Sequence, residues 1–293
     1  MHRSFFLILL AHVPLFSCMT SLGSDSTASA PQTTLSRRLG ELARNTPLCV
    51  GHRGAAQDFP ENTLPSFMAA LAAGADMVEL DFHQSADGIL ICMHDATLDR
   101  TTDIGQRLGR KEVKLASLPA AQTLALDAGS WKDPRFAGTP PPTLEQALDV
   151  IQAGSITMIE HKGGEPEKLI ELLRNKNLID EVLVQSFDWD FLEAVHQLEP
   201  SLTIGALGGE ELTDERLINI RRTGASMVHW NGQDLAANAD AIAKLRRRSY
   251  LICVYTVNKD EDFLRVNALG VDAITTDRPA RLIELIEQGK LRR

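Results

Sequence analysis

The sequence predicts a single α/β domain in which eight parallel strands close into a (β/α)8 barrel, the TIM-barrel fold. Short β-type runs alternate with amphipathic helical stretches from Pro47 onward, which is typical of βαβ units. No Gly/Pro-rich linker divides this part of the chain. The 293-residue chain leaves about 250 residues after position 46, the usual size of this fold.

Nine runs rich in apolar and β-branched residues predict the strands. They are residues 48–53, 77–82, 89–94, 157–162, 182–187, 202–207, 226–231, 251–257 and 272–277. The second and third runs are too close for a parallel crossover, which needs about a dozen residues, and Asp87-Gly88 between them is a hairpin signal. The third run therefore returns antiparallel, and a turn centred there would set His94 opposite Asp81. Eight parallel strands remain.

The connections follow the same pattern. The first predicted helix has Thr63 as a possible cap, Pro65 in its first turn and Gly74 at its end. Residues 95–142 are less regular and predict a long loop or small insertion over the strand ends, where barrels of this kind carry their sites.

The amino terminus predicts export. Residues 1–17 place Arg3 before a short apolar run, as in a secretory signal peptide. Two processing sites compete, a lipobox-like Leu15-Phe16-Ser17-Cys18 and the Ala28-Ser29-Ala30 site of ordinary signal peptidase. We favour lipidation of Cys18, which predicts a membrane-anchored lipoprotein; cleavage after Ala30 predicts a periplasmic protein. Residues 18–46, rich in Ser and Thr at their start, are expected to be a flexible tether, which leaves 47–293 as the barrel domain.

Composition excludes several function classes. A formal net charge of -9 repels the phosphate backbone of nucleic acids, so no nucleic-acid partner is expected. The four cysteines follow no CxxC spacing, and the three besides Cys18 are expected to be buried thiols. P-loop, GxSxG and HExxH motifs are missing from the sequence, which removes the usual signals of NTPases, serine hydrolases and zinc proteases. The oligomeric state is not predicted.

Polar side chains gather where the predicted strands end, and these ends meet at one mouth of a barrel. They are His52, Arg53, Glu79, Asp81, His94, Glu160 and Lys162. Residues two apart on a strand project from the same face, so the carboxylates of Glu79, Asp81 and Glu160 would converge at this mouth. They would repel one another unless a cation joins them, and carboxylate oxygens favour Ca²⁺ or Mg²⁺. We therefore expect one divalent cation on Glu79, Asp81 and Glu160.

The other polar residues at the mouth suit a phosphodiester. The guanidinium of Arg53 can bind phosphate through two hydrogen bonds, and Lys162 can place a charge beside it. His52 and His94 can exchange protons with the attacking and leaving oxygens, and we assign His52 as general base and His94 as general acid. Together these groups predict phosphodiester hydrolysis.

The motifs resemble those of the glycerophosphodiester phosphodiesterases over roughly residues 48–286. The matching segments are His52-Arg53-Gly54, Pro60-Glu61-Asn62-Thr63, Glu79 to Asp81, Asp87-Gly88, His94-Asp95, Leu98 to Thr102, Pro142-Thr143-Leu144, Glu160 to Lys162, Gln185-Ser186-Phe187, Thr256-Val257-Asn258 and Thr276-Asp277-Arg278-Pro279. The resemblance implies a TIM-barrel hydrolase of lipid and glycerol metabolism that converts small glycerophosphodiesters to an alcohol and glycerol 3-phosphate. It implies Ca²⁺ or Mg²⁺ on Glu79, Asp81 and Glu160, the pair His52 and His94 in catalysis, Arg53 on phosphate, and Lys162 on the substrate or metal shell.

Several assignments stay open. Glu61 and Trp230 are further candidates for substrate binding, while Gln185 is undecided and His161, where the family usually has an apolar residue, should face the helices. Related sphingomyelinase D-like enzymes leave a cyclic phosphate, so a phospholipase D-like or cyclising enzyme on lysophospholipids is an alternative. Another is a non-catalytic lipoprotein that binds glycerophosphodiesters.

Overall fold

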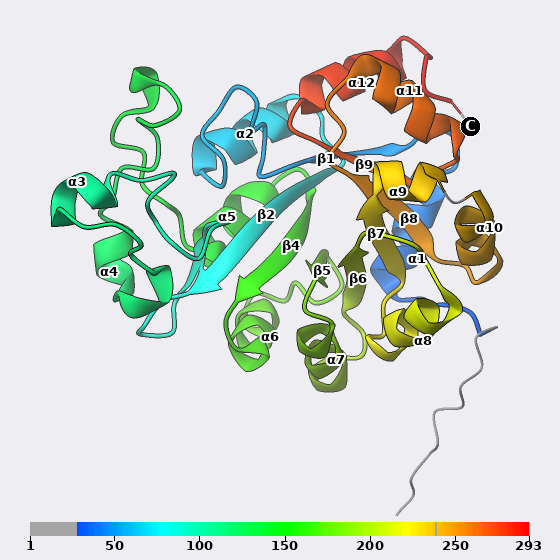
Figure 1. Ribbon diagram of the computed structural model, residues 1–293, viewed down its shortest axis with the longest axis horizontal. Coiled ribbons are helices and arrows are strands. Elements are labelled where there is room, and N and C mark those ends of the chain that lie inside the picture. The colour runs from blue at the N-terminus through cyan, green and yellow to red at the C-terminus, as the bar shows by residue number, and fades with distance from the viewer. Residues whose placement is uncertain (1–27, 238, 293) are drawn as a thin grey trace, which may run out of the picture.

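The computed structural model describes residues 28–237 and 239–292, and its centre is a closed barrel of eight parallel strands (Figure 1). The sheet order is β1-β9-β8-β7-β6-β5-β4-β2, and β1 pairs with β2 to close it. The strands are β1 Leu48–Gly51, β2 Met77–Gln84, β3 Leu90–Cys92, β4 Ile156–Gly163, β5 Val182–Ser186, β6 Thr203–Gly208, β7 Met227–Asn231, β8 Leu251–Tyr255 and β9 Ala273–Thr276. The predicted (β/α)8 barrel is confirmed.

Strand β3 is the predicted antiparallel addition, but its predicted register is wrong by one residue. It pairs with β2 so that Phe82 lies opposite Cys92, and the backbone N–H of Met93 donates to the carbonyl of Asp81. His94 is therefore not opposite Asp81. The turn holds Gly88 at φ 85°, a conformation that favours glycine, and the Ser85 and Asp87 side chains bond to each other across it.

Helices lie around the barrel, and most of them cover its outer face (Figure 1). They are α1 Thr34–Leu42, α2 Leu64–Ala72, α3 Ile104–Leu108, α4 Ala120–Thr123, α5 Leu144–Ile151, α6 Pro166–Asn175, α7 Trp189–Leu198, α8 Asp214–Arg222, α9 Gly232–Ala237, α10 Ala239–Arg247, α11 Asp260–Ala268 and α12 Pro279–Glu287. Their apolar stripes pack on outward-facing strand residues, as in α5, where Leu144, Leu148 and Ile151 are fully buried. None of the helices in the described ranges is long and apolar enough to cross a bilayer.

Helix α1 corrects the predicted tether of residues 18–46. The Thr33 side chain accepts a hydrogen bond from the Ser36 N–H and begins the helix. Leu35 and Leu39 are fully buried among strand residues that include Met77, so the helix covers the barrel end opposite the strand carboxyl ends. Apolar residues at helical spacing here outweigh the Ser/Thr-rich composition before them. The predicted signal peptide 1–17 and the first part of the tether lie outside the described residues.

The burial of α1 gives a direct test of this correction. Replacing Leu39 by Ala is expected to lower the free energy of unfolding by about 2–5 kcal/mol, because the change opens a cavity under the barrel. Leu42 on the same helix is 52% exposed, and Leu42→Ala should change the free energy of unfolding by less than about 0.5 kcal/mol. Urea unfolding of both variants measures this difference, and equal stabilities would show that α1 does not support the barrel.

The insertion predicted for residues 95–142 is a small subdomain beside the barrel (Figure 1). It holds α3, α4 and the short 3-10 helices Leu115–Ser117 and Pro134–Phe136. Its own apolar cluster includes Leu98, Ile104 and Leu115 and reaches β3 through Ile91. Within the described residues, the three cysteines Cys49, Cys92 and Cys253 are free and buried, as predicted.

Candidate active site

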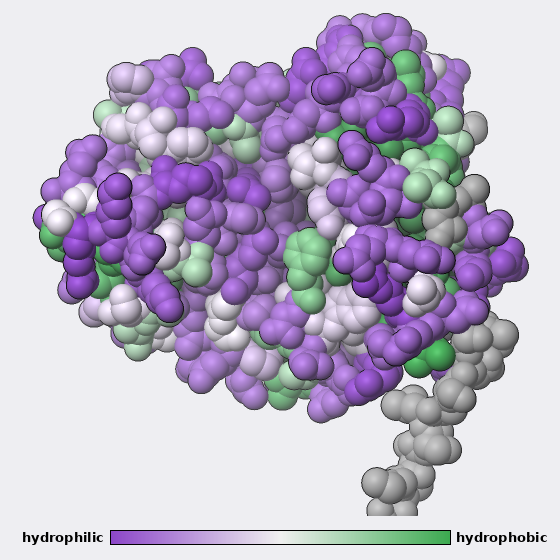
Figure 2. All heavy atoms as spheres, viewed as in Figure 1, coloured by the Kyte–Doolittle hydropathy of each residue, from purple (hydrophilic) through white to green (hydrophobic). Residues whose placement is uncertain are grey.

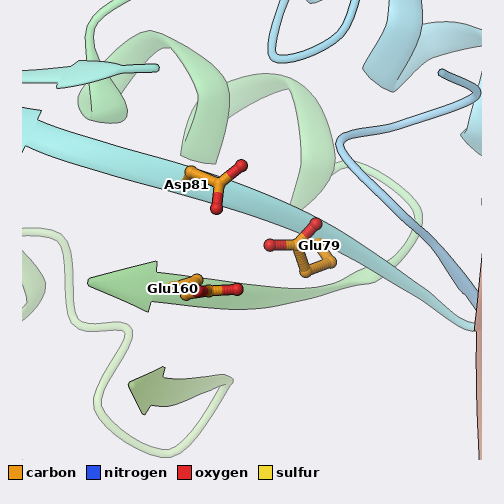
Figure 3. Close-up of side chains that lie close together, drawn as sticks. All are labelled: Glu79, Asp81 and Glu160. Atoms are coloured by element: carbon orange, nitrogen blue, oxygen red, sulfur yellow. The ribbon is translucent and has the colours of Figure 1, made fainter. Parts of the chain in front are cut away.

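Three buried carboxylates meet inside the barrel on adjacent strands. Glu79 and Asp81 lie two residues apart on β2, and register pairs Asp81 with Glu160 on β4 (Figure 3). One oxygen from each lies within 4.8 Å of the others, and none of the three residues is more than 7% exposed. The structure thus brings together the three residues that the sequence predicted as metal ligands.

The electrostatics of this cluster fit a hard divalent cation. Burial, followed by repulsion from Asp81 and Glu160, raises the pKa of Glu79 well above its usual value. Burial and the charge of Asp81 likewise raise the pKa of Glu160 to about 7. Among the described residues, the buried Oε1 of Glu79 has no hydrogen-bond partner. A carboxylate oxygen that lacks a hydrogen-bond partner and lies close to two further carboxylates is a suitable ligand for Ca²⁺ or Mg²⁺.

Two cations face the cluster. The Nε of Arg53 lies 3.3 Å from Asp81, and the Nζ of Lys162 lies 3.5 Å from Asp81 and also pairs with Glu160. Burial acts to raise the pKa of Asp81, but the charges of Arg53 and Lys162 outweigh it and hold this pKa below its usual value. The same carboxylates outweigh burial at Lys162 and raise its pKa, so the ammonium stays charged.

Arg53 occupies a strained position that the carboxylates support. Its φ is 51°, in the left-handed region that non-glycine residues rarely adopt. Its backbone N–H donates to Glu79 over 2.8 Å, and the next residue, Gly54, could not carry a Cβ because Ser66 lies within 2.6 Å of that position. This tight turn after β1 is what aims Arg53 at the carboxylate cluster.

Each of the two predicted catalytic histidines is held by a carboxylate. The Nδ1 of His52 lies 2.7 Å from Asp277, and the Nδ1 of His94 lies 2.7 Å from Asp95. Each carboxylate accepts a hydrogen bond from Nδ1–H and so leaves Nε2 as the nitrogen for proton exchange. Burial lowers the pKa of His94 in spite of Asp81 and Asp95. Asp277 and Asp95 both lie in the sequence motifs, but the motifs did not predict them as partners of the histidines.

These groups line a common cavity of about 270 Å3 at the carboxyl ends of the strands. Its wall includes His52, Arg53, Glu79, His94, Glu160 and Lys162 together with Gln185, Phe187, Leu207, His229, Tyr255, Thr256 and Thr275. Figure 2 shows that this face of the molecule is largely hydrophilic, hollowed near its middle, and carries a hydrophobic patch beside the hollow. In the wall of this cavity, Phe187, which is 54% exposed, lies edge to face with Tyr255.

Two candidates from the sequence lie outside this wall. Glu61 bonds to Arg53 over 2.7 Å and to Arg100 through both oxygens, so it orients the guanidinium of Arg53. Trp230 is 1% exposed and lines a neighbouring cavity. His161 faces outward as expected and stacks on Phe191 of α7 with ring centroids 3.5 Å apart.

Gln185 and His229 form a buried pair at the floor of the cavity. The Nδ1 of His229 donates to the Oε1 of Gln185 over 2.6 Å, and its Nε2 accepts from the Thr275 hydroxyl over 3.0 Å. Burial, with a smaller contribution from His52, lowers the pKa of His229 to about 3. The sequence left Gln185 undecided and missed His229, whose place in a buried apolar strand gave no separate signal.

His229 predicts a pH dependence of stability. An unfolded histidine takes up a proton below about pH 6.5, whereas folded His229 stays neutral down to about pH 3. Folding is therefore opposed increasingly as the pH falls through this window, by about 1.4 kcal/mol per pH unit. His229→Asn, which keeps a donor toward Gln185, should lose stability less steeply between pH 6.5 and 4. Urea unfolding at several pH values measures both slopes, and equal slopes would contradict the prediction.

The comparisons with known proteins agree with this arrangement. A sequence model of the Glycerophosphoryl diester phosphodiesterase family matches residues 52–281. The chain is 35% identical over 262 residues to a glycerophosphodiester phosphodiesterase of Bacillus subtilis strain 168, an alignment that covers 81% of this chain and 86% of the relative. The crystal structure of a glycerophosphodiester phosphodiesterase from Agrobacterium tumefaciens is similar with a TM-score of 0.71 and 28% identity, over 81% of this chain and 99% of the other.

One further solved structure contains a product. It is an Oleispira antarctica phosphodiesterase in complex with the product sn-glycerol-3-phosphate, with a TM-score of 0.74 and 26% identity. The match covers 83% of this chain and 97% of that one. The residues matched by the family model, 52–281, include strands β2 to β9 and the site residues from His52 to Asp277.

Proposed function

Because the chain belongs to the glycerophosphoryl diester phosphodiesterase family, we propose that it hydrolyses small glycerophosphodiesters to an alcohol and sn-glycerol 3-phosphate. The observation that carries this proposal is the set of residues around the catalytic cavity, the 270 Å3 cavity at the carboxyl ends of the strands. A buried three-carboxylate cluster, two cations and two carboxylate-held histidines line or adjoin the same 270 Å3 space. This combination suits an anionic ester whose two oxygens must exchange protons.

The formal charges support binding of a divalent cation before the substrate. When all three carboxylates are ionised, they exceed the charges of Arg53 and Lys162 by one negative charge, which would repel a phosphodiester anion. One divalent cation on Glu79, Asp81 and Glu160 changes the sign to one positive charge. The bound cation supplies a Lewis acid that stabilises negative charge on the phosphoryl oxygens.

We assign the proton transfers to the two histidines. The Nε2 of His52 accepts a proton from water as the water oxygen forms a bond to phosphorus, and Asp277 holds the ring through Nδ1. The bond between phosphorus and the head-group alcohol breaks, and His94 delivers a proton from Nε2 to that oxygen. The negative charge of the bound diester counters the effect of burial on the pKa of His94 and helps it to keep this proton.

Arg53 and Lys162 hold the phosphate during these steps. Arg53 is fixed by Glu61 and by the turn after β1, which leaves it little freedom when substrate arrives. Lys162 contacts both Asp81 and Glu160 and lies 5.8 Å from the centre of the Phe187 ring, so it lies between the carboxylate cluster and the aromatic side of the mouth. Both act by orienting the diester and by offsetting its charge.

The test is release of glycerol 3-phosphate from glycerophosphocholine by the full chain with Ca²⁺, Mg²⁺ or EDTA. We expect metal-dependent release, with free choline as the second product. Titration of each cation identifies the preferred one. A cyclic phosphate in place of glycerol 3-phosphate would overturn attack by water in favour of internal attack. Turnover of lysophospholipids alone would overturn the substrate class, and binding without turnover would overturn the activity.

We further propose that the protein is exported and anchored to a membrane through lipidated Cys18. The basic residue and apolar run before Cys18 support this, as does the position of the barrel well after it in the chain. Fractionation of cells that express the wild type and Cys18→Ser tests it. Membrane association of the wild type that is lost in the variant is expected, whereas a soluble wild type would leave cleavage after Ala30 as the processing route.

A further inference from the structure

Arg100, in the insertion beside the barrel, connects the two carboxylates that hold Arg53 and His94. Its Nη2 donates to Glu61 over 2.8 Å and to Asp95 over 2.9 Å. The same Glu61 oxygen accepts from Arg53 over 2.7 Å, and the same Asp95 oxygen lies 2.7 Å from the Nδ1 of His94. Four consecutive hydrogen bonds therefore run from the guanidinium of Arg53 to the imidazole of His94, with Arg100 at their centre.

Two further hydrogen bonds fix the orientation of this link. The Nη1 of Arg100 donates to the second Glu61 oxygen over 2.9 Å, and its Nε donates to the second Asp95 oxygen over 2.7 Å. Each carboxylate is thus held through both of its oxygens. A planar guanidinium has five N–H donors spread over three nitrogens, whereas a lysine ammonium has three donors on one atom. The arrangement therefore requires arginine at position 100.

The backbone around Arg100 is anchored inside the insertion. Leu98 is fully buried, and the hydroxyl of Thr102 donates to its carbonyl over 2.6 Å. Thr101 is 3% exposed and donates its hydroxyl to the sulfur of Met93 over 3.2 Å. The Arg100 side chain, by contrast, is 44% exposed and extends from this turn to the two carboxylates. The insertion therefore supplies a fixed point from which Arg100 reaches residues that follow β1 and β3.

Arg100 also sets the charge beside His94. Its hydrogen bonds are the largest cause that holds the pKa of Asp95 below its usual value, against the opposing effect of burial. Asp277, the partner of the other catalytic histidine, instead accepts a hydrogen bond from the neutral side-chain amide of Asn258 over 2.6 Å. A carboxylate whose charge is offset by an arginine stabilises an imidazolium less, so His94 gives up its proton more readily. This difference fits His94 as the proton donor.

We propose that Arg100 is a positioning residue for the reaction, which bridges Asp95 and Glu61 and thereby holds the proton donor and the phosphate-binding arginine in one arrangement. The inference rests on the proposed function, to which it adds a residue outside the catalytic cavity. Binding of the diester phosphate by Arg53 and proton delivery by His94 then depend on the same side chain. Removal of Arg100 should displace both groups, and a displacement of about 1 Å can lower a rate by about 100-fold.

The test compares two leaving groups with the full chain and a saturating divalent cation. Arg100→Ala is expected to lower kcat for glycerophosphocholine by about 10- to 100-fold. A glycerophosphodiester of 4-nitrophenol needs no proton from His94, so its kcat should fall by less than about fivefold. KM should rise several-fold for both substrates, because Arg53 is held less well. Equal losses of kcat on the two substrates, or no loss on either, would overturn the inference.

A matched control separates positioning from attachment of the insertion to the barrel. Arg135 lies in the same insertion and donates to the Asp58 carbonyl over 2.9 Å, in the loop that also contains Glu61. Arg135→Ala should keep wild-type kcat on both substrates, and a loss as large as in Arg100→Ala would overturn the inference. Arg100→Lys keeps the charge but cannot bond to both carboxylates through both oxygens. It should still lose more on glycerophosphocholine than on the 4-nitrophenol diester, and full activity of this variant would also overturn the inference.

Binding of sn-glycerol 3-phosphate provides a readout that does not require turnover. Calorimetric titration with Ca²⁺ or Mg²⁺ present should show several-fold weaker binding to Arg100→Ala than to the wild type, and unchanged binding to Arg135→Ala. If this pattern is found while no diester is hydrolysed, the proposed function fails and the inference stands. If diesters are hydrolysed while Arg100→Ala matches the wild type in binding and kcat, the proposed function stands and the inference fails. Equal binding to all three proteins without turnover would overturn both.

Discussion

Replacement of His52 or His94 by Ala is expected to lower kcat for glycerophosphocholine by about 10²- to 10⁴-fold, the usual range for loss of a general acid or base. Each imidazole is held by a carboxylate at 2.7 Å, and its second nitrogen is the one available to the substrate. KM should change far less, because Arg53 and Lys162 still bind the phosphate. His196→Ala, on helix α7 outside the catalytic cavity, is the matched control and should keep wild-type kcat.

The leaving group separates the two roles. A glycerophosphodiester with a 4-nitrophenol leaving group does not need a proton as the bond to phosphorus breaks. His94→Ala should therefore lose less than about tenfold on this substrate, while His52→Ala should lose as much as on glycerophosphocholine. The reverse pattern would exchange the assigned roles. Equal and full losses for both variants on both substrates would show that neither residue is the general acid for the leaving alcohol.

Loss of the metal site is the second large effect. EDTA should abolish turnover, and Glu79→Gln should do the same at cation concentrations that saturate the wild type, because one of three anionic ligands becomes neutral. The cation should also stabilise the wild type, by about 2.7 kcal/mol at one hundred times its dissociation constant. Glu79→Gln should lose most of this stabilisation. Without a cation the variant should be no less stable than the wild type, because repulsion with Asp81 and Glu160 is relieved.

Asp76→Asn is the control for this metal experiment. Asp76 is a partly buried carboxylate that accepts the Cys49 N–H over 2.8 Å, before the start of β2 and away from the three-carboxylate cluster. Its variant should retain the full cation-induced rise in melting temperature. Thermal unfolding with and without Ca²⁺ or Mg²⁺ measures all three proteins. An undiminished rise in Glu79→Gln would remove Glu79 from the proposed metal site.

Much of the site could be predicted because it lies on strands. Alternation along β2 places Glu79 and Asp81 on one face, and parallel pairing with β4 brings Glu160 to the same level. These relationships are local or follow from the barrel, so residue types and spacing were sufficient. The register of β3 was not, because a shift of one residue in a hairpin turn changes every opposite pair.

The sequence did not predict which side chains from distant segments contact each other. His52 and Asp277 are 225 residues apart, and His229 and Gln185 are 44 apart on strands that do not pair directly. Helix α1 shows the same limit for the fold, since its burial depends on the open end of the barrel formed by later residues. The neighbouring cavity likewise depends on contacts between segments, since Trp189 of α7 bonds to Leu207 of β6 and Trp230 of β7 bonds to Glu210 in the loop after β6.

The sequence by itself determined the barrel, the family resemblance and the identities of the polar residues at the strand ends, because hydrophobic periodicity and short motifs are encoded locally. Tertiary structure alone decided which carboxylate holds each histidine, that Glu61 bonds to Arg53, and that Trp230 lines a neighbouring space. The reason is that side-chain partners and cavities depend on how separate strands and loops pack, and a one-dimensional pattern contains no record of those distances.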